Sequence, residues 1–302
     1  MIDVNKSVSW GSAANVASCS ILNISAWQSL ATVKTFVMSG KGLPPSGSLY
    51  RGYGANLSCD VSARSVVFIA NDFFSRVIMK SQDLTPAESC LGGLFSGAFS
   101  GPFSSVFERI MILTQIQEPN SIAKKNGAIE QVVKTILAKE GAQGFGRGMF
   151  ITTSRESITY GCFFGLKNLF QNQFEKSIED KKVASFMSCF SAGALAGALT
   201  TPLDLIKTRM QAEVGHNITT FQMTSRVLKE GIIGSLGNFK IAAIRELFRG
   251  CLVRSGTVGI TMATFGFLLE SPLISTSKNE PFFSETSLAI RRNGGFPPVI
   301  VR

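Results

Sequence analysis

The segment TPLDLIKTRMQ, residues 201–211, closes a long apolar stretch with a proline, an acid and two bases. No side chain is charged from residue 183 to residue 203, and about 20 apolar residues in a helix are enough to span the core of a bilayer. Charges and a proline at the end of such a helix are costly. The segment therefore predicts a membrane helix with a kink at Pro202 and a functional ion pair at its end.

A second copy of this pattern lies 96 residues earlier in the chain. The equivalent positions are Gly193 and Gly97, Gly197 and Gly101, Asp204 and Glu108, and Gln211 and Gln115. One fixed offset that carries two glycines, an acid and a glutamine indicates an internal repeat. We therefore expect the fold to be built from copies of a single unit.

The repeated pattern resembles the signature of the mitochondrial carrier family, Pro-x-Asp/Glu-x-x-Lys/Arg-x-Lys/Arg, which that family carries three times. The third copy in this chain is complete, with Pro202, Asp204, Lys207 and Arg209. The second copy keeps Glu108, but the places of the proline and the two bases hold Val106, Met111 and Leu113. In the first copy, SLATVKTFVM, only Lys34 remains, and the other places hold Ser29, Ala31, Phe36 and Met38. The resemblance extends over residues 9–271.

The resemblance implies an all-α membrane protein with six transmembrane helices, arranged as three pseudo-threefold repeats around a central cavity. The repeats are assigned to residues 7–80, 85–174 and 183–271, and a polar tail follows at residues 272–302. The expected spans are 7–33, 52–79, 85–117, 148–174, 183–211 and 250–270. Short amphipathic helices are expected on the matrix side, and the apolar spacing of residues 126–140 predicts one of them.

Two local features qualify this pattern. In the span 85–117, Pro102 lies one turn before Val106, so any kink there is expected one turn earlier than the kink at Pro202. The connection between Gly231 and Arg249 is longer than the family pattern, and the sequence does not explain this insertion.

The composition independently favours a membrane protein. Of 302 residues, 45% are hydrophobic and only 17% are charged, and the mean hydropathy is +0.22. The net charge of +10 is spread over the connections between apolar segments, which indicates a positive-inside bias rather than a nucleic-acid surface. With the family resemblance, this predicts the mitochondrial inner membrane, with both termini on the intermembrane-space side. Residues 1–10 include an acid and no small-residue cleavage site, so no removable targeting peptide is expected.

The residues that usually carry catalysis or bind metals are sparse. The six cysteines lie in apolar or small-residue segments without a CxxC pair, and the single histidine, His216, lies in a polar connection. This predicts free packed thiols and a solvated histidine rather than a metal site. No nucleophile stands beside a histidine base, and the glycine-rich segment 140–148 follows no expected strand. We therefore expect neither an enzyme nor a bound cofactor.

Arg-Gly pairs open the even-numbered spans and provide a common frame for the cavity. The seventh and eighth residues after their glycines are Cys59 and Asp60, Arg155 and Glu156, and Thr257 and Val258. In the family these places contact the solute, and an arginine–acid pair in the middle repeat is similar to that of carriers for amino acids and carnitine-like zwitterions.

The chemistry of these side chains agrees with that implication. Arg155 can bind a carboxylate through two hydrogen bonds, while Glu156 or Asp60 can bind an ammonium group. Arg64 and Arg254 each lie one turn from a cavity position, so positive charge is in excess and a carboxylate or phosphate is favoured over a simple cation. The alternative is an internal ion pair, such as Arg155 with Asp60, that only fixes the packing of the helices.

The resemblance also implies a gate on the matrix side, in which the signature acid of each repeat pairs with the base of the next. The resulting contacts are Glu108 with Lys207, Asp204 with Lys34, and an apolar contact of Ala31 with Met111. Gln115 and Gln211 lie one turn beyond Met111 and Lys207, and we expect them to brace the closed gate by hydrogen bonds.

These residues favour an alternating-access solute carrier of the mitochondrial inner membrane. A zwitterionic or carboxylated metabolite, of the amino-acid or carnitine type, is the first hypothesis, and a nucleotide or phosphorylated cofactor is the second. A proton-leak protein or a non-transporting adaptor on the same scaffold is the alternative of another class. The expected partners are the solute and membrane lipid, including cardiolipin at the matrix-side helix ends. We expect a monomer that binds no nucleic acid.

Overall fold

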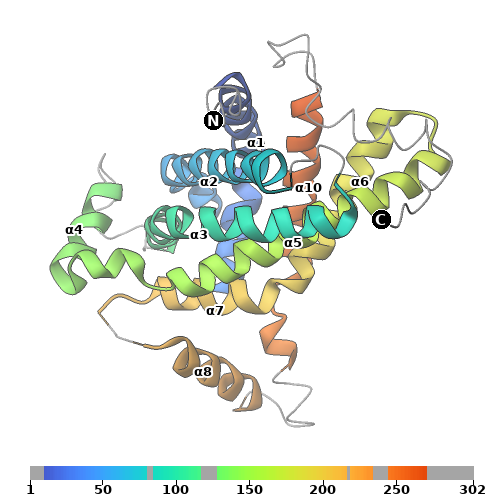
Figure 1. The fold of residues 1–302 in the computed structure, drawn as a ribbon. Coiled ribbons are helices and arrows are strands. Elements are labelled where there is room, and N and C mark those ends of the chain that lie inside the picture. Colours follow the sequence, from blue (N-terminus) through green and yellow to red (C-terminus); the bar gives the residue numbers. More distant parts are fainter. Residues whose placement is uncertain (1–9, 80–83, 117–127, 216–217, 234–243, 271–302) are drawn as a thin grey trace, which may run out of the picture.

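The computed structural model describes residues 10–79, 84–116, 128–215, 218–233 and 244–270, and these residues contain helices but no β-strand (Figure 1). The long helices are α1 (Trp10–Met38), α2 (Tyr53–Phe73), α3 (Pro86–Ile116), α5 (Met149–Ser177), α6 (Lys181–Leu199) and α10 (Cys251–Glu270). The shorter helices include α7 (Thr201–Ala212), which follows α6, and α4 (Ala128–Glu140) and α8 (Thr220–Ile233), which lie outside the long ones. His216, the tail at 272–302 and residues 234–243 of the insertion lie outside the described residues.

Capping residues explain where several of these helices begin. Thr85 and Glu88 form a capping box at the start of α3, in which each side chain accepts a hydrogen bond from the other residue's backbone N–H. Thr219 and Gln222 make the same pair of contacts at the start of α8. At the start of α6, the Asp180 carboxylate accepts a hydrogen bond from the Lys182 N–H at 2.9 Å.

The long helices close into a ring. Along the chain, α1 packs against α2, α2 against α3, α3 against α5, α5 against α6, and α6 against α10, which returns to α1 (Figure 1). The return contact includes buried polar groups, because Asn23 on α1 donates a hydrogen bond to the Thr261 carbonyl and accepts one from Thr264 on α10. This order is the one expected for tandem repeats around an axis.

Glycines allow α3 and α5 to approach closely. A Cβ atom added at Gly93 would lie 2.3 Å from the Tyr160 carbonyl oxygen, and one added at Gly97 would lie 2.6 Å from that of Glu156. At Gly101 an added Cβ would lie 2.4 Å from the Thr153 Cα. Since real Cβ atoms do not approach backbone so closely, the spacing of the two helices depends on these glycines.

The two prolines expected at kinks lie in different backbone settings. The expected span 183–211 is divided at Thr200, and Pro202 is the second residue of α7, where the missing N–H of proline is tolerated. Pro102 lies inside α3, which continues through it without interruption. The helix break therefore falls next to the complete signature of the third repeat.

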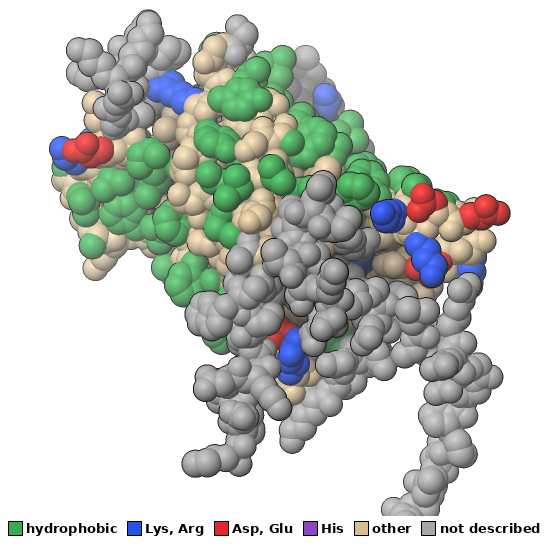
Figure 2. All heavy atoms as spheres, turned by 90° about the horizontal axis from the view of Figure 1, so that it is seen from above, with side chains coloured by type: hydrophobic (Ala, Val, Ile, Leu, Met, Phe, Trp, Pro, Cys, Tyr) green, Lys and Arg blue, Asp and Glu red, His purple; other side chains and the backbone are tan. Residues whose placement is uncertain are grey.

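Many polar side chains are buried, and many large apolar side chains are exposed. Fully buried polar side chains include Ser20, Asn23, Gln28, Ser100, Arg109, Gln115 and Asp204. Exposed apolar side chains include Leu22, Phe99, Phe103, Phe150 and Leu252, and Figure 2 shows hydrophobic side chains spread over an outer face. Such a surface is typical of contact with lipid.

Two stretches of the described residues, Lys181–Leu199 and Ile244–Leu269, are long and apolar enough to cross a membrane by length and composition. The other described helices fall below that measure. The all-α character is thus confirmed, whereas six spans stay a prediction. All six cysteines are free thiols that are buried or half-buried, and no group of three His, Cys, Asp or Glu side chains within the described ranges could hold a metal ion.

Candidate functional site

A layer of charged side chains lies inside the ring of helices. We call it the ionic layer, and its members are Lys34 on α1, Glu108 on α3, Arg155 and Glu156 on α5, Asp204 and Lys207 on α7, and Arg254 on α10. Apart from Lys34, whose side chain is 19% exposed, all of them are buried. Each helix reaches the layer from a different direction, so the charges meet near the axis of the ring.

Glu108 joins two helices to α3. Its Oε2 accepts a hydrogen bond from Lys207 Nζ at 2.5 Å, and its Oε1 accepts one from Arg155 Nη2 at 2.7 Å. Arg155 also pairs with its neighbour Glu156. Both carboxylate oxygens of Glu108 are therefore occupied by cations of other helices, which satisfies a charge that would otherwise be costly to bury.

Asp204 is the other centre of the ionic layer. Its Oδ2 accepts a hydrogen bond from Arg254 Nη1 and lies 3.4 Å from Lys34 Nζ. Its Oδ1 lies 3.2 Å from Arg155 Nη1 and 3.6 Å from Lys207 Nζ, which are ion-pair distances without hydrogen-bond geometry. One buried carboxylate thus faces four cations.

The helix break at Thr200 is part of the same site. Arg254 Nη2 donates to Thr200 Oγ1 at 2.9 Å, and Arg254 Nε donates to the Gly197 carbonyl at 3.2 Å. Thr159 on α5 also donates to Thr200 Oγ1, at 3.3 Å. The break exposes backbone and side-chain acceptors that hold Arg254 against Asp204.

The two ion pairs that the sequence predicts for the gate come together in this layer, Glu108 with Lys207 and Asp204 with Lys34. Arg155 and Arg254 are predicted to face the solute, and that role stays a prediction. Arg155 also contacts both gate acids, and Arg254 contacts Asp204. The close approach of α3 and α5 at Gly97 brings Arg155 within reach of Glu108. Aligning signatures compares only equivalent positions, so it misses contacts of this kind.

The remaining predicted cavity residues lie near the ionic layer. Asp60 pairs with Arg64 on the next turn of α2 at 2.7 Å, so the alternative pairing of Arg155 with Asp60 is replaced by separate partners. The Arg64 guanidinium also lies 4.4 Å from the centre of the Phe265 ring. Thr257 and Cys59 are buried, and each hydroxyl or thiol donates to a backbone carbonyl, that of Val253 and that of Ser104 respectively.

A family model described as mitochondrial carrier protein matches residues 82–177 and 179–271. The chain belongs to the mitochondrial carrier family. Members of this family that resemble the chain are transporters, and their names specify different solutes.

Three relatives illustrate this range within the mitochondrial carrier family. A mitochondrial arginine transporter of Arabidopsis thaliana is 30% identical over 177 residues, or 56% of this chain and 57% of that protein. A probable mitochondrial 2-oxodicarboxylate carrier of Dictyostelium discoideum is 28% identical over 174 residues, covering 55% and 56%. A mitochondrial thiamine pyrophosphate carrier of Aspergillus terreus is 26% identical over 241 residues, covering 72% and 71%. The chain spans just over half the length of the first two.

In this mitochondrial carrier, the glycines that precede α2, α5 and α10 make equivalent contacts around the ring. Gly52, Gly148 and Gly250 have left-handed φ angles of 74°, 76° and 80°, which favour glycine. A Cβ added to them would lie 3.2 Å from Gln115 Cγ, 3.5 Å from Gln211 Cγ and 3.6 Å from Met38 Cγ, respectively. Each glycine thus faces the same signature place in another repeat.

Of the two glutamines predicted to brace the gate, only Gln115 makes a side-chain hydrogen bond among the described residues. Gln115 donates a hydrogen bond to Thr32 Oγ1 at 3.5 Å, whereas the buried Gln211 amide has no hydrogen-bond partner, unlike the expected brace. Gln211 packs against Gly148 instead. Met111 is buried in an apolar cluster with Ala55 and Ile112, and the Ala31 carbonyl accepts a hydrogen bond from Thr35.

A second charged cluster connects α3 to α4 outside the ring, and the signature analysis did not find it. Glu140, at the end of α4, accepts hydrogen bonds from Arg109, Arg147 and the Gly215 N–H. Burial alone would raise the pKa of Glu140, but these donors hold it below its usual range. In the third repeat, the signature base Arg209 pairs with Glu230 and Glu246. In the second repeat Leu113 takes that base's place, and Arg109 binds the acid instead.

Proposed function

We propose that the chain exchanges a small zwitterionic or carboxylated metabolite across the mitochondrial inner membrane by alternating access. In this proposal six spans form three repeats around an axis, and both termini lie on the intermembrane-space side. The ring order of the helices, the apolar outer face and the polar interior support this arrangement. The named relatives support transport of a small solute.

The ionic layer is the observation that carries the proposal. It holds the four cations Lys34, Arg155, Lys207 and Arg254 against three carboxylates, so positive charge is in excess before a solute binds. Arg155 of the cavity frame is a partner of both gate acids, and Arg254, one turn from the frame, is a partner of Asp204. Separating a buried arginine from its carboxylate partner is costly unless another anion takes the place of that carboxylate.

This arrangement supports a direct coupling between solute and gate. A solute carboxylate that binds Arg155 through its planar guanidinium replaces Glu108 and Asp204 as the partner of that arginine. The ammonium of a zwitterion binds Glu156 or Asp60. The two gate acids then lose a cation that holds α3 and α7 against α5, and the matrix side opens. An empty protein keeps these pairs and stays closed on that side.

A phosphorylated cofactor is the second candidate, because the excess of cations also suits phosphate oxygens and because one relative of the chain is named a thiamine pyrophosphate carrier. The two candidates differ in what must balance the ionic layer. A zwitterion brings its own cation for Glu156, whereas a phosphorylated solute needs all four cations.

Liposomes that contain the purified protein test the proposal. Counter-exchange of radiolabelled amino acids, 2-oxoacids and thiamine pyrophosphate is measured with and without internal solute, and proton flux is followed with an internal dye. We expect saturable exchange of a carboxylated or zwitterionic solute, and Arg155→Lys to reduce it strongly because a point charge does not replace a planar fork. Solute-independent proton flux would instead identify a leak protein, and no flux of any kind would identify a non-transporting scaffold.

A further inference from the structure

Glu156 is the acid of the ionic layer with the fewest partners. Among the described ion pairs, Arg155 is its only cation, whereas Glu108 has two and Asp204 has four. The Glu156 side chain is also 11% exposed, while that of Asp204 is fully buried. Glu156 is therefore the acid of this layer that is most easily left without a cation, and it is accessible to a proton.

Charged and titratable side chains lie around Glu156 on the neighbouring helices as well as on α5. They are Cys59 and Arg64 on α2, Glu108 on α3, Lys207 on α7, Arg254 on α10, and Arg155 and Tyr160 on α5 itself. The helix α6 also packs against α5, but its charged residues, Lys181 and Lys182, lie at its start. The cations other than Arg155 already pair with other acids, Lys207 with Glu108, Arg254 with Asp204, and Arg64 with Asp60.

A solute carboxylate at Arg155 competes with Glu156 for one nitrogen atom. A guanidinium binds a carboxylate through two hydrogen bonds along one of two edges, Nη1 with Nη2 or Nε with Nη2. Arg155 Nη2 is the atom that pairs with Glu156 and that donates to Glu108 at 2.7 Å. A solute on either edge therefore competes with both acids. Glu108 still has Lys207 when it is displaced, whereas Glu156 has no second cation among the described ion pairs.

A buried carboxylate without a cation is costly, and two groups can restore the balance. The ammonium group of a zwitterionic solute can take the place of Arg155 beside Glu156. A solute without an ammonium group, such as a 2-oxoacid, does not provide this partner. The uncharged carboxylic acid, formed when Glu156 takes up a proton, is then the form that needs no counter-ion.

Resting on the proposed function, we infer that Glu156 carries a proton with each 2-oxoacid or other carboxylate that lacks an ammonium group, and none with a zwitterion. The proton comes from water on the side where the solute enters, and it forms the O–H bond of the Glu156 carboxylic acid. When the solute leaves on the other side, that bond breaks, the proton returns to water there, and Glu156 pairs with Arg155 again. A 2-oxoacid with its proton has the same net charge as the corresponding amino acid. A pH difference across the membrane therefore drives 2-oxoacids but not amino acids.

Liposomes that exchange an external 2-oxoacid for its internal amino acid test the inference. The matched pairs are pyruvate with alanine and 2-oxoglutarate with glutamate, because the members of each pair differ at a single position, which carries an oxo or an ammonium group. We expect an internal pH dye to report the entry of a proton with each exchange. A pH difference of one unit, alkaline inside, should raise the accumulation of the 2-oxoacid about tenfold. Exchange of a 2-oxoacid for itself should move no net proton.

Variants of Glu156 locate the proton. The amide of Glu156→Gln cannot take it up, so the acidification should disappear, and amino-acid uptake should fall because the ammonium group loses its partner. Glu156→Asp keeps a carboxylate, so it should keep the acidification at a reduced rate. Glu175→Gln is the matched control, because Glu175 lies near the end of the same helix, where it accepts a hydrogen bond from Gln171 at 3.0 Å. It should exchange and acidify like the unchanged protein.

Exchange of a 2-oxoacid for an amino acid without acidification, driven by an imposed membrane potential instead, would overturn the inference while leaving the proposed function intact. The same holds for acidification that persists in Glu156→Gln and for exchange that is confined to amino acids. Exchange of thiamine pyrophosphate alone would overturn the inference in favour of the second candidate solute. If no solute of the panel is exchanged, the proposed function fails and the inference fails with it.

Discussion

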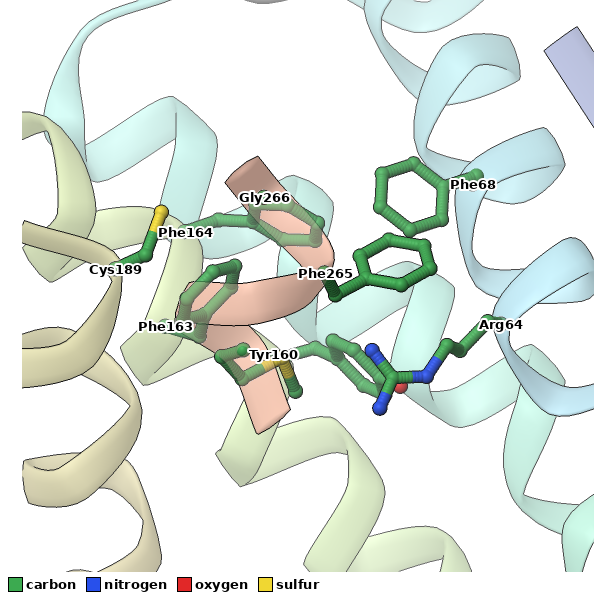
Figure 3. A pocket seen from close by; sticks show the side chains of 9 residues that line it. Arg64, Phe68, Tyr160, Phe163, Phe164, Cys189, Phe265 and Gly266 are labelled. Carbon is green, nitrogen blue, oxygen red and sulfur yellow. The ribbon is translucent and has the colours of Figure 1, made fainter. Parts of the chain in front are cut away.

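One turn beyond Glu156 of the ionic layer, α5 carries Tyr160, which belongs to a packed group of rings (Figure 3). We call this group the aromatic layer, and its members are Phe68, Tyr160, Phe163, Phe164 and Phe265. The two layers differ in the kind of contact that holds the helices together. In the ionic layer, carboxylates such as Asp204 face several cations, and each contact is directional and costly to separate in a dry interior. In the aromatic layer, rings such as Phe68 and Phe164 touch edge to face, and such contacts are weak, numerous and tolerant of small shifts. We expect the ionic layer to act as a latch that is either closed or open, and the aromatic layer to tolerate small shifts of the helices.

The largest expected effect is the difference between one substitution in the ionic layer and one in the aromatic layer. Asp204→Asn leaves four cations with one fewer carboxylate, so it should abolish exchange and lower the free energy of unfolding by about 3 kcal/mol. Phe164→Leu should cost about 1 kcal/mol, since an apolar side chain still fills the site. Liposome exchange and thermal unfolding in detergent measure both. Equal losses in the two variants would contradict the distinction between the layers.

Two glycines of α3 can perturb the layers one at a time. Gly97 abuts the backbone of Glu156 and Gly93 abuts that of Tyr160, so alanine at either place pushes α5 away from α3. We expect each variant to be less stable by about 2 kcal/mol, with the larger loss of exchange rate in Gly97→Ala, because Gly97 abuts Glu156 of the ionic layer. Gly256→Ala is the control, because no atom lies within 4 Å of its added Cβ, and it should be neutral or slightly stabilising.

The ionic layer is itself uneven, which provides a finer test. Lys207 is 2% exposed and contacts Glu108 at 2.5 Å, whereas Lys34 is 19% exposed and lies 3.4 Å from Asp204. Lys207→Gln should therefore reduce exchange by about tenfold and Lys34→Gln by about threefold, since partly hydrated pairs are weaker. The measurement is the initial rate of counter-exchange. A larger loss of exchange rate in Lys34→Gln than in Lys207→Gln would mean that the ion pair of the first repeat contributes more to closing the gate.

The smallest expected effect lies outside both layers, at Glu140. Its pKa is lowered by Arg109, Arg147 and a backbone N–H against the opposing effect of burial, so its carboxylate stabilises the fold at neutral pH. That contribution is present above the usual pKa of glutamate, about 4.3, and is lost as the pH falls through the lowered pKa of the folded protein. Glu140→Gln should lower the melting temperature at pH 7, and the difference from the unchanged protein should shrink below pH 4.3.

Glu130→Gln is the matched control for this experiment. Glu130 lies on the same helix and pairs with Lys134, but both side chains are exposed. Salt screens such a pair, so its loss should leave the melting temperature almost unchanged. If the two variants behave alike, the contacts of Glu140 do not anchor α4 to the ring.

The sequence predicted the helices more completely than their side-chain contacts. Apolar periodicity and the Arg-Gly pairs place α3 and α5 within a few residues of the structure, because helix ends depend on local signals such as Thr85 and Gly148. The gate pairs Glu108 with Lys207 and Asp204 with Lys34 follow from aligning the repeats.

The contacts of Arg155 and Arg254 could not be read in the same way. They depend on how closely neighbouring helices approach and on where α6 ends, at Thr200, and neither property is periodic in the sequence. The same holds for the aromatic layer, whose rings occupy ordinary apolar positions when each helix is considered alone. The role of Arg109 at Glu140 was equally hidden, although Leu113 at the place of a signature base was a signal that another cation should be sought.

Asp204 touches every repeat of the chain through one carboxyl group, but not equally. Lys207 and Arg254 belong to the third repeat and Arg155 to the second, and both of these repeats are also joined through Glu108. The first repeat reaches Asp204 through Lys34 alone among the described ion pairs of this layer. Within the ionic layer, the first repeat is therefore held by one partly hydrated ion pair, whereas the second and third repeats are held to each other by several buried ones. We expect the first repeat to leave this layer first when the gate opens.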